Sequence, residues 1–237
     1  MNLWIALAVA VISYLVGSLS FARIVYRLTT GKNLEDLELV SQKTGQAFRA
    51  DSISASTVGA ALGKRMGMFV SLLDIVKAAA VVLPARLLFP GQVFYLVAAV
   101  FVLLGHIFPV YYHFQGSGGF TVMLGSLVLI DWPAAVILPI AGPLIGLILL
   151  RSLPLAFILW VPLLIVWMWL RGAPAPYLWY AVATNVVFIT GMTPQALRIL
   201  RQRREGQSSV GNAWVDSTPM GRGFVRMAKF FKVKIPD

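Results

Sequence analysis

The chain has 237 residues, of which 59% are hydrophobic and only 12% are charged. Soluble domains carry about 25% charged residues. A mean hydropathy of +0.81 also implies more apolar surface than a soluble fold of this length buries. The net charge of +11 is typical of nucleic-acid-binding proteins, but these basic residues stand at the ends of apolar segments and in the C-terminal tail. We therefore expect an integral membrane protein whose Lys and Arg lie beside anionic lipid, with membrane lipids and not nucleic acid as its partners.

Residue types that build many metal and redox sites are scarce. The chain has no cysteine, which excludes disulfides, thiol catalysis and cysteine-ligated metals. Its two histidines, His106 and His113, are too few for a histidine-based metal cluster. The sequence therefore predicts neither a metal site nor a cofactor.

Seven apolar segments are candidates to cross the bilayer, which requires about 20 mostly apolar residues per helix. They cover residues 3–25, 66–89, 92–111, 120–130, 134–150, 153–170 and 177–197. The fourth is short for a full crossing, so we expect it to be tilted or to begin inside the preceding loop. The predicted fold class is an all-α integral membrane protein with about seven transmembrane helices, and residues 1–200 form its membrane domain.

The basic residues predict the orientation. With the N-terminus outside, nearly all Lys and Arg lie in the cytoplasmic segments and the tail, and only Arg86 and Arg171 remain outside. The opposite orientation would place most of the charge outside, against the positive-inside rule. We therefore predict an external N-terminus and a cytoplasmic C-terminus.

Two polar segments flank the apolar ones. Residues 29–65 form the longest internal loop, and their Ser, Thr and Gly content indicates a folded or re-entrant element. Residues 201–237 form a basic tail in which apolar and basic side chains mix over residues 224–235. That mixture fits either an amphipathic segment lying on the membrane or a disordered tail held there by charge.

Three polar residues fall inside predicted spans. Asp74 and Lys77 are three residues apart and so share one helix face. They form an ion pair that has either a functional role or the structural role of holding helices together. Asn185, in the last span, is expected to hydrogen-bond a neighbouring helix.

Three stretches of sequence resemble a known family. Residues 13–21 (SYLVGSLSF) end the first helix, and residues 62–67 (LGKRMG) lead into residues 72–77 (LLDIVK). Residues 105–125 run from GHIFPV through FQGSGG to LG. In this order and spacing the chain resembles the bacterial acyl-phosphate-dependent glycerol-3-phosphate acyltransferases, from residue 10 to about residue 205.

The resemblance implies a multi-pass enzyme of phospholipid biosynthesis in the bacterial plasma (inner) membrane, with seven spans and its active site on the cytoplasmic face. Such an enzyme transfers an acyl group from acyl phosphate to glycerol 3-phosphate and produces lysophosphatidic acid. Several motif positions differ here. The family pattern G-S-G-N-I-G-A-T-N-V-x-R aligns with residues 49–60, and its Ser, two Asn and Arg positions hold Ala50, Ser52, Thr57 and Ala60. Two Lys positions of the second loop hold Gln115 and Gly118, and the His and Asn positions of the third motif hold Met192 and Gln195.

Both implied substrates are polyanions, so their site requires cations and backbone N–H groups directed at phosphate oxygens. Glycines of the second loop let the backbone approach a phosphate closely. The hydroxyl residues of the first loop either bind a phosphate or cap a helix that begins near Val58, and nearby basic residues are candidate replacements for the missing cations. The candidate binding residues are Arg49, Ser52, Ser54, Ser56, Thr57, Lys64, Arg65, Gly116, Ser117, Gly118 and Gly119.

His106 is the imidazole of the GHIFPV string. It is either a general base for acyl transfer or a structural histidine at the membrane boundary.

Two functions follow from these residues. One is a divergent acyltransferase with a rebuilt site. The other is a catalytically silent relative that binds lipid or serves as a subunit beside a membrane-protein partner. A transporter is disfavoured because the sequence shows no inverted repeat.

Overall fold

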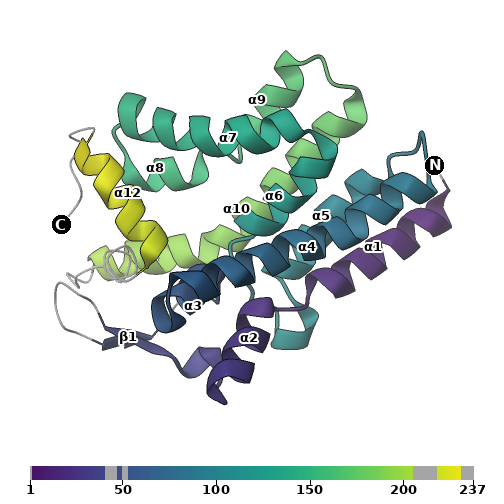
Figure 1. Ribbon diagram of the computed structural model, residues 1–237. Helices are drawn as coiled ribbons and strands as arrows, with labels where there is room; N and C mark the ends of the chain where they lie inside the picture. Colours follow the sequence, from purple (N-terminus) through teal and green to yellow (C-terminus); the bar gives the residue numbers. More distant parts are fainter. Residues whose placement is uncertain (1, 41–46, 50–52, 205–217, 231–237) are drawn as a thin grey trace.

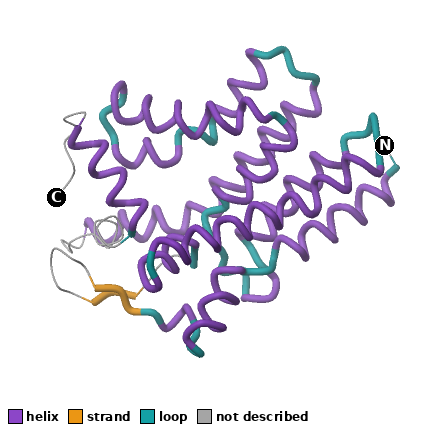
Figure 2. Tube along the Cα trace, in the orientation of Figure 1, coloured by secondary structure: helices purple, strands orange, loops and turns teal. Residues whose placement is uncertain are grey.

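The structure is a computed structural model that describes residues 2–40, 47–49, 53–204 and 218–230. Helices make up most of the described chain, and two short strands form a ribbon at one edge (Figures 1 and 2). The predicted all-α class is therefore confirmed. The principal helices are α1 (Leu3–Gly17), α2 (Phe21–Thr30), α3 (Ala55–Leu62), α4 (Lys64–Leu88), α5 (Phe94–Ile107), α6 (Phe120–Ile130), α7 (Trp132–Leu144), α8 (Leu153–Ile158), α9 (Leu163–Leu170), α10 (Ala175–Arg204) and α12 (Pro219–Phe230).

Four helical stretches in the described chain are long and apolar enough to cross a membrane. They are Leu3–Thr30, Lys64–Leu88, Phe94–Tyr112 and Trp132–Leu149. Helix α6 has only 11 residues, as the sequence indicated. The count of seven crossings and the orientation of the chain stay predictions.

The predicted first helix, residues 3–25, is in fact two helices. Helix α1 ends at Gly17 and α2 begins at Phe21. At the break, the carbonyl oxygens of Gly17 and Leu19 accept hydrogen bonds from the buried ammonium group of Lys77. The break is therefore stabilised by a side chain about 60 residues away in sequence.

The predicted span 153–170 is also divided. Helix α8 ends at Ile158 and α9 begins at Leu163, with turns between them. Pro162 precedes α9, and its ring nitrogen has no N–H to continue a helix from α8. In the last helix Asn185 donates to the Val161 carbonyl oxygen at 3.1 Å, which confirms the expected link to a neighbouring segment.

Helix α5 lies at the centre of the bundle, where it packs against α1, α4 and α10 (Figure 1). Its buried Val102 and Leu103 join a hydrophobic core that also contains side chains of α4, α6 and α10. A second apolar cluster joins α2 to α3 and α4 through residues that include Val25, Val58 and Val70. The second cluster thus packs α2 and α3 against the first half of α4.

The polar loop is folded, as its composition indicated. It contains a 3₁₀ turn (Leu34–Asp36), an antiparallel pair of strands, β1 (Glu38–Val40) and β2 (Ala47–Arg49), and helix α3. Helix α3 lies close against α4, because a Cβ atom at Gly67 would come within 2.8 Å of the Ala55 carbonyl oxygen.

The tail contains helix α12, which overlaps the segment of mixed apolar and basic residues over residues 224–230. The ring of Phe224 stacks on Phe157 of α8 with centroids 3.9 Å apart, and Ala228 is buried with Leu147 and Ala156. Its exposed side chains include Arg226 and Lys229. The structure thus contains a docked amphipathic helix at residues 219–230, and residues 231–235 of the predicted segment lie outside the described residues.

Candidate functional site

Helices α1 and α5 approach closely where both carry glycine. A Cβ atom at Gly17 would lie 2.9 Å from the Cα of Val102, and one at Gly105 would lie 2.9 Å from the Ser18 nitrogen. Real Cβ atoms essentially never come so close to backbone. The glycines of the SYLVGS and GHIFPV strings therefore bring the end of α1 beside His106.

A buried ionic cluster, formed by Asp74, Lys77 and His106, occupies this contact. The Lys77 ammonium lies 3.1 Å from the Gly17 carbonyl oxygen, 2.7 Å from that of Leu19 and 2.9 Å from His106 Nδ1. It also forms an ion pair with Asp74 Oδ1 at 3.3 Å. The ion pair predicted from sequence is confirmed, and it joins α4 to both α1 and α5.

The cluster engages Nδ1 of His106. A lysine ammonium has three N–H donors and no acceptor, so His106 Nδ1 accepts a hydrogen bond when Lys77 is charged. This geometry favours the structural alternative for His106, which is buried at 7% exposure.

The Gly-rich loop, residues 109–119, follows directly from the cluster. Ser117 donates its backbone N–H to the His106 carbonyl oxygen at 3.3 Å, and Tyr14 donates its hydroxyl to the Phe108 carbonyl oxygen at 2.9 Å. His113 and Phe114 have positive φ angles of 50° and 60°. For non-glycine residues such angles carry strain, which clusters at functional sites in proteins.

The loop ends at the N-terminus of α6. Gly119 is its N-cap at φ 78°, a conformation that glycine adopts without steric cost. The first N–H groups of a helix have no acceptors within the helix, and together with the helix dipole they attract anions. Gly118 and Gly119 thus place backbone N–H groups of a kind suited to phosphate at the end of the Gly-rich loop.

Arg23 is a functional candidate that sequence reasoning missed. Its side chain lies on the inward face of α2, only 6% of the residue is exposed, and its NH2 donates to the Gln115 carbonyl oxygen at 2.7 Å. The guanidinium also stacks over the Tyr112 ring, 4.3 Å from its centroid. Its NH1 is buried and has no hydrogen-bond partner in the described chain. No motif in the sequence marks Arg23.

Glu35 shares the guanidinium with the loop. Arg23 donates Nε–H to Glu35 Oε1 at 2.5 Å. Burial raises the pKa of the Glu35 carboxyl, but the hydrogen bond and charge of Arg23 outweigh it, so the pKa lies below its ordinary value. Arg23 therefore joins α2, the 3₁₀ turn and the Gly-rich loop.

The first-loop hydroxyls form a helix cap. Ser54 is the N-cap of α3, where its Oγ accepts from the Thr57 N–H at 3.3 Å and lies 3.1 Å from Thr57 Oγ1. This geometry matches the capping alternative, and the half-buried Ser56 follows in the first turn. Ser52 lies outside the described residues.

Of the proposed replacement cations, the structure describes the side chains of Lys64 and Arg65, and neither hydrogen-bonds or ion-pairs with the Gly-rich loop. Lys64 and Arg65 are exposed in the first turn of α4. The backbone of Arg49 pairs with Glu38 in the two-stranded ribbon, and its side chain lies outside the described part. Arg23 hydrogen-bonds the Gly-rich loop through the Gln115 carbonyl oxygen.

Helix α10 reaches the same loop through Met192. A Cβ atom at Gly118 would lie 3.9 Å from Met192 Sδ. The two positions where the family pattern has Lys and His therefore meet, and here they carry glycine and a thioether. Gln195 has a side chain outside the described part.

Comparisons with known proteins agree with this architecture. The family described as glycerol-3-phosphate acyltransferase matches residues 7–202. A glycerol-3-phosphate acyltransferase of Coxiella burnetii (strain RSA 493 / Nine Mile phase I) is 30% identical over 178 residues, which covers 66% of this chain and 86% of that protein. One of Ehrlichia chaffeensis is 35% identical over 124 residues, and the match spans 52% of this chain and 57% of that protein.

A solved structure has a similar fold. The crystal structure of PlsY (YgiH), an integral membrane glycerol 3-phosphate acyltransferase in its glycerol 3-phosphate form, has a TM-score of 0.66 and 26% identity to this chain. The match covers 84% of this chain and 93% of PlsY. The family match covers most of the chain, and the motifs that it includes meet at one site. The chain therefore belongs to the glycerol-3-phosphate acyltransferase family.

Proposed function

We propose that this chain transfers an acyl group from acyl phosphate to glycerol 3-phosphate and produces lysophosphatidic acid for membrane phospholipid synthesis. The observation that carries this proposal is the Gly-rich loop, which joins the buried ionic cluster to the N-terminus of α6. The family membership supports the proposal further, since the similar PlsY crystal structure is the glycerol 3-phosphate form of that enzyme.

The reaction needs little from a side-chain base. The glycerol hydroxyl oxygen attacks the acyl carbon, the new ester bond forms, and the bond from that carbon to the phosphate oxygen breaks. The departing phosphate carries oxygens that accept the hydroxyl proton. The transfer therefore does not require His106 as a base, and its Nδ1 already contacts Lys77. The protein's part is to position two anions and stabilise the charge that develops on oxygen.

Arg23 is the cation that we assign to this site. It holds the Gln115 carbonyl, which lies in the segment where the family pattern has lysines. Its unpaired NH1 is an unsatisfied buried donor, and a phosphate oxygen would satisfy it. Glu35 is then the internal anion that the guanidinium binds before substrate arrives.

Acyl transfer by the purified full chain in nanodiscs tests the proposal. Replacing Arg23→Gln removes the charge and should lower kcat/KM by ~30-fold, the equivalent of about 2 kcal/mol for a charged contact. Arg27→Gln is the matched control, because Arg27 lies one turn later on α2 and is exposed. Equal loss in both variants, or none in either, would contradict the role of Arg23.

A second function has a specific observation in its favour. Met192 packs beside Gly118 where the family pattern has His and Lys, and a thioether does not bind phosphate. A relative that is catalytically silent and binds lipid, or that serves as a subunit with a membrane-protein partner, would retain the fold and lose those groups. A folded protein that retains lipid and shows no turnover would favour this alternative.

The proposed setting is the bacterial inner membrane. Seven crossings, an external N-terminus and a cytoplasmic tail are supported by the distribution of Lys and Arg along the chain. This orientation would place the Gly-rich loop and Arg23 on the cytoplasmic side.

A further inference from the structure

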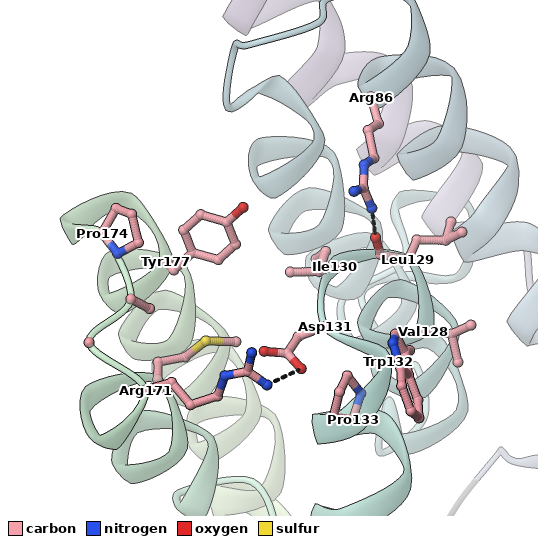
Figure 3. Close-up of a pocket in the computed structure, with 13 residues that line it drawn as sticks. Arg86, Val128, Leu129, Ile130, Asp131, Trp132, Pro133, Arg171, Pro174 and Tyr177 are labelled. Atoms are coloured by element: carbon pink, nitrogen blue, oxygen red, sulfur yellow. Dashed lines mark hydrogen bonds and ion pairs between the residues drawn. The ribbon is translucent and has the colours of Figure 1, made fainter.

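A cavity of about 500 Å³ lies at the end of the bundle opposite the Gly-rich loop. It forms where α4 and α6 end and where α7 and α10 begin, and its lining side chains converge from these elements (Figure 3). Arg86 and Arg171 both line it. These are the two basic residues that the predicted orientation leaves outside, so the fold brings the isolated external cations to one cavity.

One wall of the cavity is held by Asp131. Its carboxylate accepts from the Ala134 N–H at 3.1 Å, as the N-cap of α7, and from Trp167 Nε1–H of α9 at 3.2 Å. Arg171 lies 3.7 Å from the same carboxylate (Figure 3). The single lining carboxylate is thus engaged with three protein groups, which fix its position.

The facing wall is held by Arg86 and a tyrosine pair. Arg86 donates one N–H to the Leu129 carbonyl oxygen (Figure 3), and its guanidinium lies over the Tyr95 ring. The hydroxyls of Tyr95 and Tyr177 are 2.5 Å apart and link the starts of α5 and α10. Both guanidinium groups are therefore held in place by protein contacts, and such preorganisation favours binding.

The side chains that line the cavity favour an anionic ligand that also carries apolar groups. Two guanidinium groups and one carboxylate leave an excess positive charge, and 51% of the Arg171 side chain is exposed. Val128 and Ile130 supply apolar surface. Trp132, 68% exposed on the rim, has the placement typical of tryptophan at the headgroup level of a bilayer. A guanidinium pairs with phosphate oxygens through two parallel hydrogen bonds.

We infer that this cavity binds the phosphate group of an anionic membrane phospholipid, with Arg86 and Arg171 on its oxygens and the acyl chains along the outside of the bundle. The inference goes beyond the proposed acyl transfer, because the cavity is at the other end of the molecule. It predicts that loss of the two arginines weakens lipid binding and leaves turnover unchanged.

Native mass spectrometry of the full chain, titrated with phosphatidylglycerol, measures this directly. The R86Q/R171Q variant should bind its tightest phosphatidylglycerol ~tenfold more weakly than the unmodified chain, as expected for losing charged contacts at a half-exposed site. R86K/R171K keeps the charge and should retain most of the affinity. Arg151→Gln is the matched control, because Arg151 is exposed before α8, away from the cavity.

Three results would overturn the inference. One is equal phosphatidylglycerol affinity in the folded R86Q/R171Q protein and the unmodified chain. Another is equally tight binding of diacylglycerol, which lacks the phosphate. The third is complete displacement of phosphatidylglycerol by inorganic phosphate, which would identify a site for free phosphate and not for lipid. Thermal unfolding of each variant shows whether it is folded, and R86K/R171K provides the charge test if R86Q/R171Q does not fold.

Discussion

Lys77 determines what His106 can do. Its three N–H donors are used by two carbonyl oxygens of the α1 end and by His106 Nδ1. The imidazole therefore serves as an acceptor for a buried ammonium group. Removing that acceptor leaves a buried donor unsatisfied, which costs about 1–3 kcal/mol.

Asparagine at position 106 separates the structural and catalytic roles. Its side-chain oxygen can accept a hydrogen bond but has no basic nitrogen. We expect His106→Asn to retain most thermal stability and turnover, and His106→Ala to lose about 1–3 kcal/mol of unfolding free energy. Thermal unfolding and acyl transfer measured on both variants check this. A His106→Asn protein as stable as the unmodified chain but inactive would make His106 the base.

Glu35 gives the molecule a defined pH dependence. Because Arg23 holds the pKa of Glu35 below its ordinary value, Glu35 adds stability above the pKa of an unfolded glutamate, about 4.3. That contribution disappears as pH falls through the lowered pKa of the folded state. Since the carboxyl is 42% exposed, the expected effect is small, under about 1 kcal/mol. The difference in Tm between the unmodified chain and Glu35→Gln should shrink from pH 6 towards acid pH, and a difference that grows would contradict the sign.

At the scale of helices, the α1–α5 contact depends on backbone meeting backbone. Gly105→Ala would place a Cβ atom 2.9 Å from the Ser18 nitrogen, where no flexible side chain can move aside. We expect a loss of about 1–3 kcal/mol from overpacking, together with reduced turnover because the contact positions the His106 backbone, to which the Gly-rich loop is hydrogen-bonded. Gly223→Ala in α12 is the control, because no atom lies within 4 Å of its added Cβ. It should be neutral or stabilise the helix by up to about 1 kcal/mol. Similar unfolding of both variants would refute the close-packing argument.

The sequence predicted elements where local pattern decides and failed where distant contacts decide. The apolar runs of α4 and α5 and the folded polar loop followed from composition. The break between α1 and α2 could not, because its carbonyl groups bond to Lys77, which is about 60 residues away. The contact of Arg23 with the Gly-rich loop could not be predicted for a similar reason, since its partner, Gln115, lies 92 positions later in the sequence. The Gly-rich segment could be predicted because glycine is typical of positions where the backbone lies close to another group.

For the whole molecule, charge predicts which end faces the cytoplasm. The chain has no native cysteine, so single cysteines report topology without background. Gln92→Cys lies just before α5, and Lys32→Cys follows α2; both native residues are exposed. In intact cells a membrane-impermeant maleimide should label Gln92→Cys, and Lys32→Cys only after permeabilisation. The reverse labelling pattern would show the opposite orientation, with the Gly-rich loop outside the cell.

The two ends of the molecule carry different proposed tasks. The Gly-rich end holds Arg23, the buried ionic cluster and the N-terminus of α6, and the other end holds the cavity with Arg86 and Arg171. Helix α12 lies beyond the family match, which stops at residue 202, and it packs on α3 and α8 (Figure 1). A substitution at the Gly-rich end should therefore change acyl transfer and not lipid binding, and a substitution in the cavity should change lipid binding and not acyl transfer.

Product formation by the unmodified chain in nanodiscs tests the central claim most directly. With acyl phosphate and labelled glycerol 3-phosphate, we predict lysophosphatidic acid and inorganic phosphate in equal amounts, because each transfer breaks one acyl–phosphate bond. The folded protein forming neither product above the rate of empty nanodiscs would contradict acyl transfer and leave the silent, lipid-binding relative as the function of this chain.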